Sequence, residues 1–178
     1  MTTRLFSFSE AASIVARSGT TNARLLVEAR ASTTGSRVFL SHSTKDNALV
    51  PGVVLLFRTH GASVYADDFD KRLPDPPNVQ TAELLKGEIK KHPRFVVLAT
   101  SNSHTSRWIP WELGLSDGYK GVPPSAILPM TPDGSIPEWY RTQYFHLYPK
   151  IVEVDGSWKV FDPRVNQHWS LSFWLNDC

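Results

Sequence analysis

The sequence predicts an α/β fold built on a parallel sheet of about five strands, with helices on both faces. From residue 37 onward, short apolar runs alternate with segments of helical periodicity. The runs are apolar throughout, which is typical of parallel strands that are covered on both sides. Turn residues separate the segments, so right-handed crossovers would place helices on either side of the sheet.

The central elements follow from these patterns in chain order. Strands are expected over residues 38–40, 63–66, 95–99 and 126–128. Helices are expected between them, over about 49–57, 82–89 and 108–119. Pro51 lacks a backbone N–H and should therefore lie in the first turn of its helix.

The two ends of the chain differ from this centre. Residues 1–36 are predicted to be an N-terminal helical extension, with Ser9 capping a helix over 10–17 and a second helix over about 22–31. This extension either packs on the domain as a helical hairpin or serves as an arm for self-assembly or partner binding. Toward the other end, Asp155 and Gly156 predict the turn of a strand hairpin. Val165, Trp169 and Phe173 then suggest a closing helix.

Composition excludes several classes of function. The 178 residues carry a net charge of +2 with no long run of one sign, which argues against a nucleic-acid or anionic-membrane surface. The single cysteine, Cys178, permits no intramolecular disulfide. No signal peptide or membrane span is apparent, so a cytoplasmic protein is expected. The spacing of Asp67, Asp68 and Asp70 matches no calcium loop, the histidines suggest no zinc set, and no nucleotide-binding glycine motif is present.

The most informative stretch is 106–112, which follows the strand expected over 95–99. A helix opening there places Trp108 and Glu112 four residues apart on one face. A carboxylate beside an indole would then face the cleft at the carboxyl end of the sheet, where open α/β folds bind ligands.

Four blocks of the chain resemble TIR domains. Residues 37–46 resemble the first strand and loop of that family, and 61–67 its second strand and the entry to a long loop. Residues 95–102 are similar to the third strand, and 106–114 to the motif on the following helix. The resemblance implies a flavodoxin-like TIR domain over 37–178, with a family-like part over 37–130 and a divergent part over 131–178.

In that family, Glu112 would be the catalytic glutamate of an enzyme that cleaves NAD+. The residues expected to line the dinucleotide cleft are Ser41, His42, Ser43, Asp46, Asp67, Asp68 and Trp108. NAD+ would be a substrate rather than a cofactor, and no metal is expected. Among bacterial relatives the chain looks like a stand-alone TIR protein of Thoeris-type phage defence. There the product is a nucleotide messenger for a separate effector, and TIR surfaces associate with one another.

Alternatives remain at this point. The product can be ADP-ribose, a cyclic form or a base-exchange conjugate. A non-catalytic TIR assembly module and a nucleoside deoxyribosyltransferase-like enzyme are competing functions. Glu112 can also be a solvated helical residue, Trp108 a core residue, His42 a structural histidine, and Asp67 and Asp68 turn residues.

Overall fold

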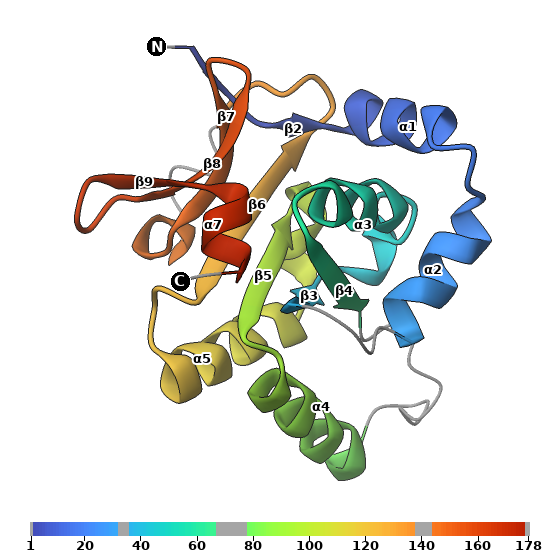
Figure 1. The fold of residues 1–178 in the computed structure, drawn as a ribbon. Coiled ribbons are helices and arrows are strands. Elements are labelled where there is room, and N and C mark those ends of the chain that lie inside the picture. Colours follow the sequence, from blue (N-terminus) through green and yellow to red (C-terminus); the bar gives the residue numbers. More distant parts are fainter. Residues whose placement is uncertain (1, 32–35, 67–77, 138–143, 177–178) are drawn as a thin grey trace.

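The computed structural model of the chain describes residues 2–31, 36–66, 78–137 and 144–176. Their strands join one nine-stranded sheet that carries helices on both faces (Figure 1). The predicted α/β class with a mostly parallel central sheet is therefore confirmed. Asp67, Asp68 and Cys178 lie outside the described residues.

Five strands form the parallel part of the sheet. Side by side they are β4 (Ala62–Ala66), β3 (Ser36–Ser41), β5 (Arg94–Ala99), β6 (Ser125–Thr131) and β7 (Lys150–Val154). Numbered along the chain, this is the order 2-1-3-4-5 of flavodoxin-like folds. The connections that leave β3 and β5 run to opposite faces of the sheet, and ligands bind at such a switch point.

The helices of the predicted crossovers are present as α3 (Val50–Thr59), α4 (Val79–Lys91) and α5 (Trp108–Lys120). Alternate residues of a strand face opposite sides, so β5 contributes to two cores. Val96 and Leu98 pack in the core beneath α3, whereas Phe95 and Val97 pack beneath α4 and α5. Fully burying such side chains stabilises the fold by roughly 1.5–3 kcal/mol each. Pro51 lies in the first turn of α3, as predicted.

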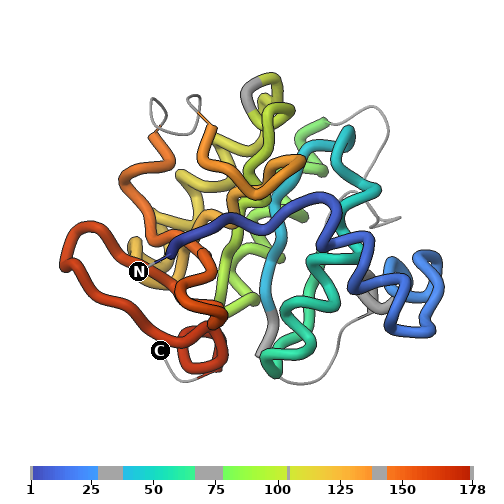
Figure 2. Tube along the Cα trace, turned by 90° about the horizontal axis from the view of Figure 1, so that it is seen from above, coloured from blue at the N-terminus to red at the C-terminus, as the bar shows by residue number. Residues whose placement is uncertain are grey.

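The chain before α1 enters the sheet, which the sequence did not predict. β1 (Thr3–Arg4) pairs with β7 in antiparallel fashion, and β2 (Phe6–Ser7) pairs with β6 in parallel. β6 and β7 share a single bridge, Ile127 to Lys150. Beyond it, residues 3–7 lie between the two strands; we call this segment the N-terminal arm. In Figure 2 the blue N-terminal segment starts beside the red C-terminal part and crosses the molecule.

Two helices follow the arm, α1 (Phe8–Arg17) and α2 (Asn22–Ala31). The expected cap at Ser9 is wrong: Ser7 is the N-cap, because it forms a capping box with Glu10 three residues later. α1 packs closely on α3, where a methyl group built on Gly52 would lie 2.5 Å from Ala11 Cβ. The helices are therefore docked on the domain, with Ala11 and Leu25 buried in the core beneath α3.

The C-terminal part extends the sheet with antiparallel strands. β8 (Ser157–Asp162) forms the predicted hairpin with β7 around Asp155 and Gly156, both of which have positive φ angles. The expected closing helix begins later than its periodicity suggested. Trp169 lies in β9 (Gln167–Ser170), and the helix is α7 (Leu171–Asn176). Trp174 of α7 is buried, and its indole N–H donates to the carbonyl of Pro123.

Candidate active site

Glu112 lies on the helix that follows β5 and reaches the carboxyl end of β3. Ser41 is the last residue of β3, and its hydroxyl donates a hydrogen bond of 2.5 Å to Glu112 Oε2. Ser41 is 0% exposed and Glu112 is 2% exposed, so the bond is shielded from water. A hydrogen bond to a carboxylate is stronger than a neutral one, and it holds this oxygen in place.

A pocket of about 360 Å³ opens beside Glu112 at the switch point of the sheet. Its volume lies in the range of small-molecule sites. Its lining residues are His42, Ser43, Thr44, Lys45, Thr105, Ser106, Arg107, Trp108 and Glu112. The loop after β3 and the segment from the end of η3 (Ser101–Thr105) into α5 therefore supply all of them.

Trp108 is both a wall of this pocket and part of the packing beneath α5. It is half-buried, packs against the core cluster on that face of the sheet, and meets Trp111 edge-on at 5.3 Å between ring centroids. The two interpretations of this residue, core and wall, thus describe different parts of one side chain.

The rim of the pocket carries two cations that the sequence analysis missed. Lys45 and Arg107 are exposed and line the pocket from its two sides, one from each loop. In the sequence, only their positions close to Ser43 and Trp108 could have indicated that they lie at the pocket. Cations at the mouth of a concave site favour an anionic ligand.

Asp46 ties together the two loops that form the pocket. Its carboxylate is 2% exposed. Oδ2 accepts a hydrogen bond of 2.7 Å from the Thr100 hydroxyl, and Oδ1 accepts one of 2.6 Å from the Asn102 side-chain amide. Asp46 is therefore a bridge between the loop after β3 and the turn after β5. Its predicted contact with a dinucleotide stays a prediction.

His42 and Ser43 shape the loop after β3. His42 is buried, and its Nε2 lies 2.8 Å from Asn47 Oδ1. The Ser43 hydroxyl accepts from the backbone N–H of Lys45 and so caps η1 (Thr44–Asp46). Both side chains also line the pocket, so their structural roles leave ligand contact open.

Short polar side chains fix the backbone in the turn that leads into α5. Thr100 and Ser103 form a capping box around η3. The Ser106 hydroxyl then accepts from the backbone N–H of Ile109 at 3.3 Å in the first turn of α5. Pro110 sits in the same turn, where its missing N–H costs no intrahelical bond. This local chemistry fixes the direction of α5, and hence the position of Glu112.

The structure thus brings most of the predicted site residues to one end of the sheet. Glu112, His42, Ser43 and Trp108 line the pocket, and Ser41 lies beneath Glu112. Asp67 and Asp68 fall outside the described residues. Within the described part of the chain, no group of three or more His, Cys, Asp or Glu side chains is placed to hold a metal ion. Of the described helices, none is long and apolar enough to cross a bilayer.

Two curated proteins are similar to this chain. One, from Bacillus cereus (strain MSX-D12), carries the provisional name 3' cyclic ADP-D-ribose synthase ThsB'; it is 31% identical over 118 residues, which are 65% of this chain and 60% of that protein. The other, from Cytobacillus dafuensis, carries the provisional name cyclic ADP-D-ribose synthase TIR2; it is 33% identical over 84 residues, 44% of this chain and 22% of that protein. The chain therefore spans less than two thirds of either relative. No protein-family model matches it.

Proposed function

We propose that the chain is a TIR-domain protein that cleaves NAD+ between nicotinamide and ribose and forms a cyclic ADP-ribose, in keeping with the names of both relatives. The observation that carries the proposal is the buried Glu112 carboxylate, which lines a pocket at the switch point of the sheet. Such a position is where flavodoxin-like folds bind their ligands.

The chemistry needs few catalytic groups. Most glycosidases use two carboxylates, one of which protonates the leaving group. The nicotinamide of NAD+ is a pyridinium, so it takes the electrons of the breaking C–N bond and leaves as a neutral base without a proton. The remaining task is to stabilise positive charge as it develops on the ribose. One fixed carboxylate beside the sugar performs it, because the attraction grows as the transition state is approached.

The residues of the pocket fit these roles. Glu112 would face the ribose, with Oε2 held by Ser41 so that little reorganisation accompanies the reaction. Trp108 supplies an aromatic wall for a flat base. Lys45 and Arg107 at the rim suit the two phosphates of a dinucleotide.

The acceptor decides the product. In cyclisation, a hydroxyl or ring nitrogen of the same nucleotide attacks the anomeric carbon as nicotinamide leaves, and a hydroxyl then loses its proton to solvent. The names of both relatives favour this outcome over hydrolysis to ADP-ribose. We further propose that the product is a messenger for a separate effector in bacterial phage defence. Self-association through TIR surfaces would complete the active form.

Replacing Glu112 by Gln tests the proposal. The amide oxygen of Gln can still accept the Ser41 hydrogen bond, so the fold is kept while the charge is removed. We expect nicotinamide release to fall about 100-fold or more, measured by liquid chromatography and mass spectrometry on concentrated protein. Glu83→Gln, on the exposed face of α4, is the matched control and should leave the rate unchanged.

Equal rates for wild type and Glu112→Gln would refute the catalytic role. Assembly with no turnover by the wild type would favour the interaction module. Turnover of free nucleosides but not of NAD+ would favour the deoxyribosyltransferase-like alternative.

A further inference from the structure

Asn47 is a polar residue of the loop after β3 that does not itself line the pocket beside Glu112. It follows η1, and its side chain is half-buried. Its side-chain oxygen Oδ1 lies 2.8 Å from Nε2 of His42, which does line the pocket. Asn47 is therefore placed to act on a bound ligand through His42 rather than by direct contact.

This contact determines where the His42 ring carries a proton. A carboxamide oxygen accepts hydrogen bonds and cannot donate them, so Nε2 must be the donor in the bond to Asn47 Oδ1. A partner of this kind sets which ring nitrogen of a histidine is protonated. The bond also restricts rotation of the ring, because hydrogen bonds weaken steeply when they are misaligned. Nε2 thus keeps its proton, and the ring keeps one orientation.

The backbone around Asn47 is itself well supported. The N–H of Asn47 donates to the carbonyl of Thr44 at 3.3 Å and so ends η1. On either side, the N–H of Asp46 donates to Ser43 and that of Leu49 donates to Asp46, both at 2.8 Å. Because Leu49 is the N-cap of α3, the acceptor oxygen is fixed to a helix of the fold as well as to the loop.

A histidine without this support would sample several states. Its side chain has three staggered χ1 wells and a broad χ2, and its neutral ring has two tautomers. A ligand that needs one of these states binds more weakly in proportion to the fraction of molecules that occupy it. One hydrogen bond shifts such an equilibrium by about tenfold. Asn47 should therefore raise the population of one His42 state by about this factor.

We propose that Asn47 is a positioning residue of the nucleotide site. It holds the His42 ring, with a proton on Nε2, in the orientation that a bound dinucleotide contacts. The identity of the ligand rests on the proposed function, whereas the orientation of the ring does not. A bound ligand itself selects the competent ring, so Asn47 should affect the KM for NAD+ and leave kcat nearly unchanged.

The first test observes the ring directly and needs no turnover. In the full chain labelled with ¹⁵N-histidine, the Nε2 proton of His42 should give a resolved N–H signal, because a buried, hydrogen-bonded proton exchanges slowly with water. The loss of this signal in His42→Gln assigns it. Asn47→Ala removes the acceptor and should abolish the signal. Asn47→Asp keeps an oxygen at the same place and should retain it.

The kinetics of nicotinamide release give the second readout. Asn47→Ala should raise the KM for NAD+ about tenfold and change kcat by less than about twofold. Ala48→Gly is the matched control: it loosens the backbone of the same turn at an exposed position but leaves Asn47 in place. Its KM should equal that of the wild type. Urea unfolding gives the folded fraction, so that rates are compared per folded molecule.

Several results would overturn the proposal. They are the absence of the N–H signal in the wild type, a signal that Asn47→Ala leaves intact, and a fall in kcat with KM unchanged. An equal rise in KM for Ala48→Gly and Asn47→Ala would also overturn it, because the stiffness of the loop would then explain the effect. Should Asn47→Ala fail to fold, Asn47→Ser takes its place, since its shorter side chain does not reach Nε2.

The two readouts also separate this inference from the proposed function. If Asn47→Ala loses the signal that Asn47→Asp retains, while the wild type releases no nicotinamide, the positioning of His42 is supported and NAD+ cleavage is refuted. If the wild type releases nicotinamide and the signal does not depend on Asn47, NAD+ cleavage is supported and the positioning role is refuted.

Discussion

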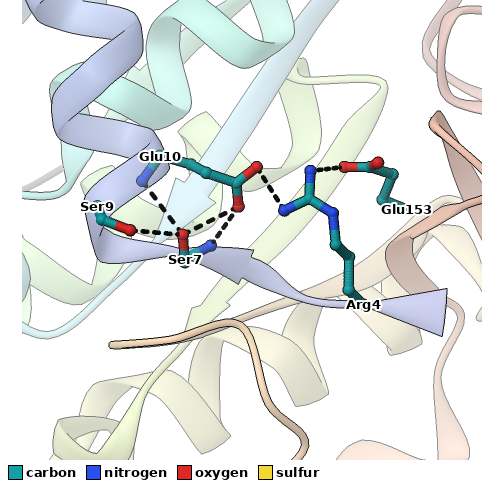
Figure 3. A network of polar contacts seen from close by, with 5 residues as sticks. All are labelled: Arg4, Ser7, Ser9, Glu10 and Glu153. Atoms are coloured by element: carbon teal, nitrogen blue, oxygen red, sulfur yellow. Dashed lines mark hydrogen bonds and ion pairs between the residues drawn. The ribbon is translucent and has the colours of Figure 1, made fainter. Parts of the chain in front are cut away.

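The switch-point end of the sheet and the arm side of the molecule bury different kinds of side chain. At the switch point, the residues that end β3 and β5 and begin α5 bury hydroxyl, imidazole and carboxylate groups: Ser41, His42, Ser43, Asp46, Thr100, Ser103 and Glu112. On the arm side, Leu5, Val152 and Val154 are buried, while the charged residues Arg4 and Glu10 are partly exposed. Figure 3 shows Arg4 between Glu10 and Glu153, with Ser7 beside them.

This contrast indicates that the two regions have different tasks. Burying polar groups costs free energy unless every group is hydrogen-bonded, so a protein that buries many of them at one place holds a specific geometry there. Apolar burial on the arm side contributes stability and fixes the arm between β6 and β7. Changes at the switch point should therefore lower nicotinamide release, and changes on the arm side should lower only the free energy of unfolding.

The largest effect in this comparison is expected for Asp46→Ala. It leaves the buried Thr100 hydroxyl and the partly buried Asn102 amide without their acceptor, which costs about 3 kcal/mol of unfolding free energy. The loop after β3 also loses its tie to the turn before α5, so nicotinamide release should fall as well. Urea unfolding and the rate assay measure the two effects.

A reciprocal exchange sharpens this prediction. In Asp46→Asn with Asn102→Asp, the amide and the carboxylate trade places, and the side-chain amide oxygen introduced at position 46 can still accept from Thr100. Stability and rate should recover toward wild type if Asp46 acts by bridging the loops. Recovery of stability with no recovery of rate would instead favour direct contact between Asp46 and the dinucleotide.

A smaller effect is expected for Gly52→Ala, where α3 packs against α1, the helix that follows the arm. The added methyl group would lie 2.5 Å from Ala11 Cβ and 2.7 Å from Ala11 Cα, so α1 must move away from α3. We expect a loss of about 1–3 kcal/mol of unfolding free energy, measured in urea, with the rate per folded molecule unchanged.

Gly87→Ala in α4 is the matched control for this change. A methyl group there meets nothing within 4 Å, so the helix should gain about 0.5–1 kcal/mol from the loss of glycine. Equal effects of the two substitutions would show that the contact between α1 and α3 is loose.

The smallest effect is expected for Arg4→Ala. Arg4 forms an ion pair of 2.5 Å with Glu10 and a second with Glu153, and its side chain is 43% exposed. Exposed ion pairs contribute at most about 1 kcal/mol, so thermal unfolding should shift by a few degrees. If nicotinamide release fell by more than the loss of folded protein explains, the two regions would not have separate tasks.

The pH dependence of this effect follows from Glu10. Burial raises the pKa of the Glu10 carboxyl, but hydrogen bonds from Arg4 and Ser7 outweigh it, so its pKa lies below the ordinary value of 4.5. A depressed carboxyl pKa stabilises the fold above the unfolded value, and this contribution is lost as pH falls through the folded pKa. The stability gap between wild type and Arg4→Ala should therefore narrow below pH 4.5 and be constant near neutrality.

The predictions from the sequence succeeded where a pattern extends over many residues. Continuous apolar runs located the four central strands, and the spacing of Trp108 and Glu112 predicted that both line one pocket. β1 and β2 were missed because two-residue strands have no periodicity, and because their partners lie more than a hundred residues away. The bridge from Asp46 to Thr100 and Asn102 was missed as well, because it forms only where the ends of two strands meet in space. The closing helix was misplaced because Val165 and Trp169 share a helical spacing with Phe173 by coincidence.

The arm has a consequence for the order in which the protein assembles. Thr3 pairs with Val154, so it is synthesised long before its partner, which becomes available only with the hairpin of β7 and β8. Until then Leu5 lacks Val152 and Val154, against which it packs, and closing so long a loop is slow. Completion of the sheet is therefore a late step in the biogenesis of the domain. A chain stalled before residue 154 would expose an apolar segment to chaperones.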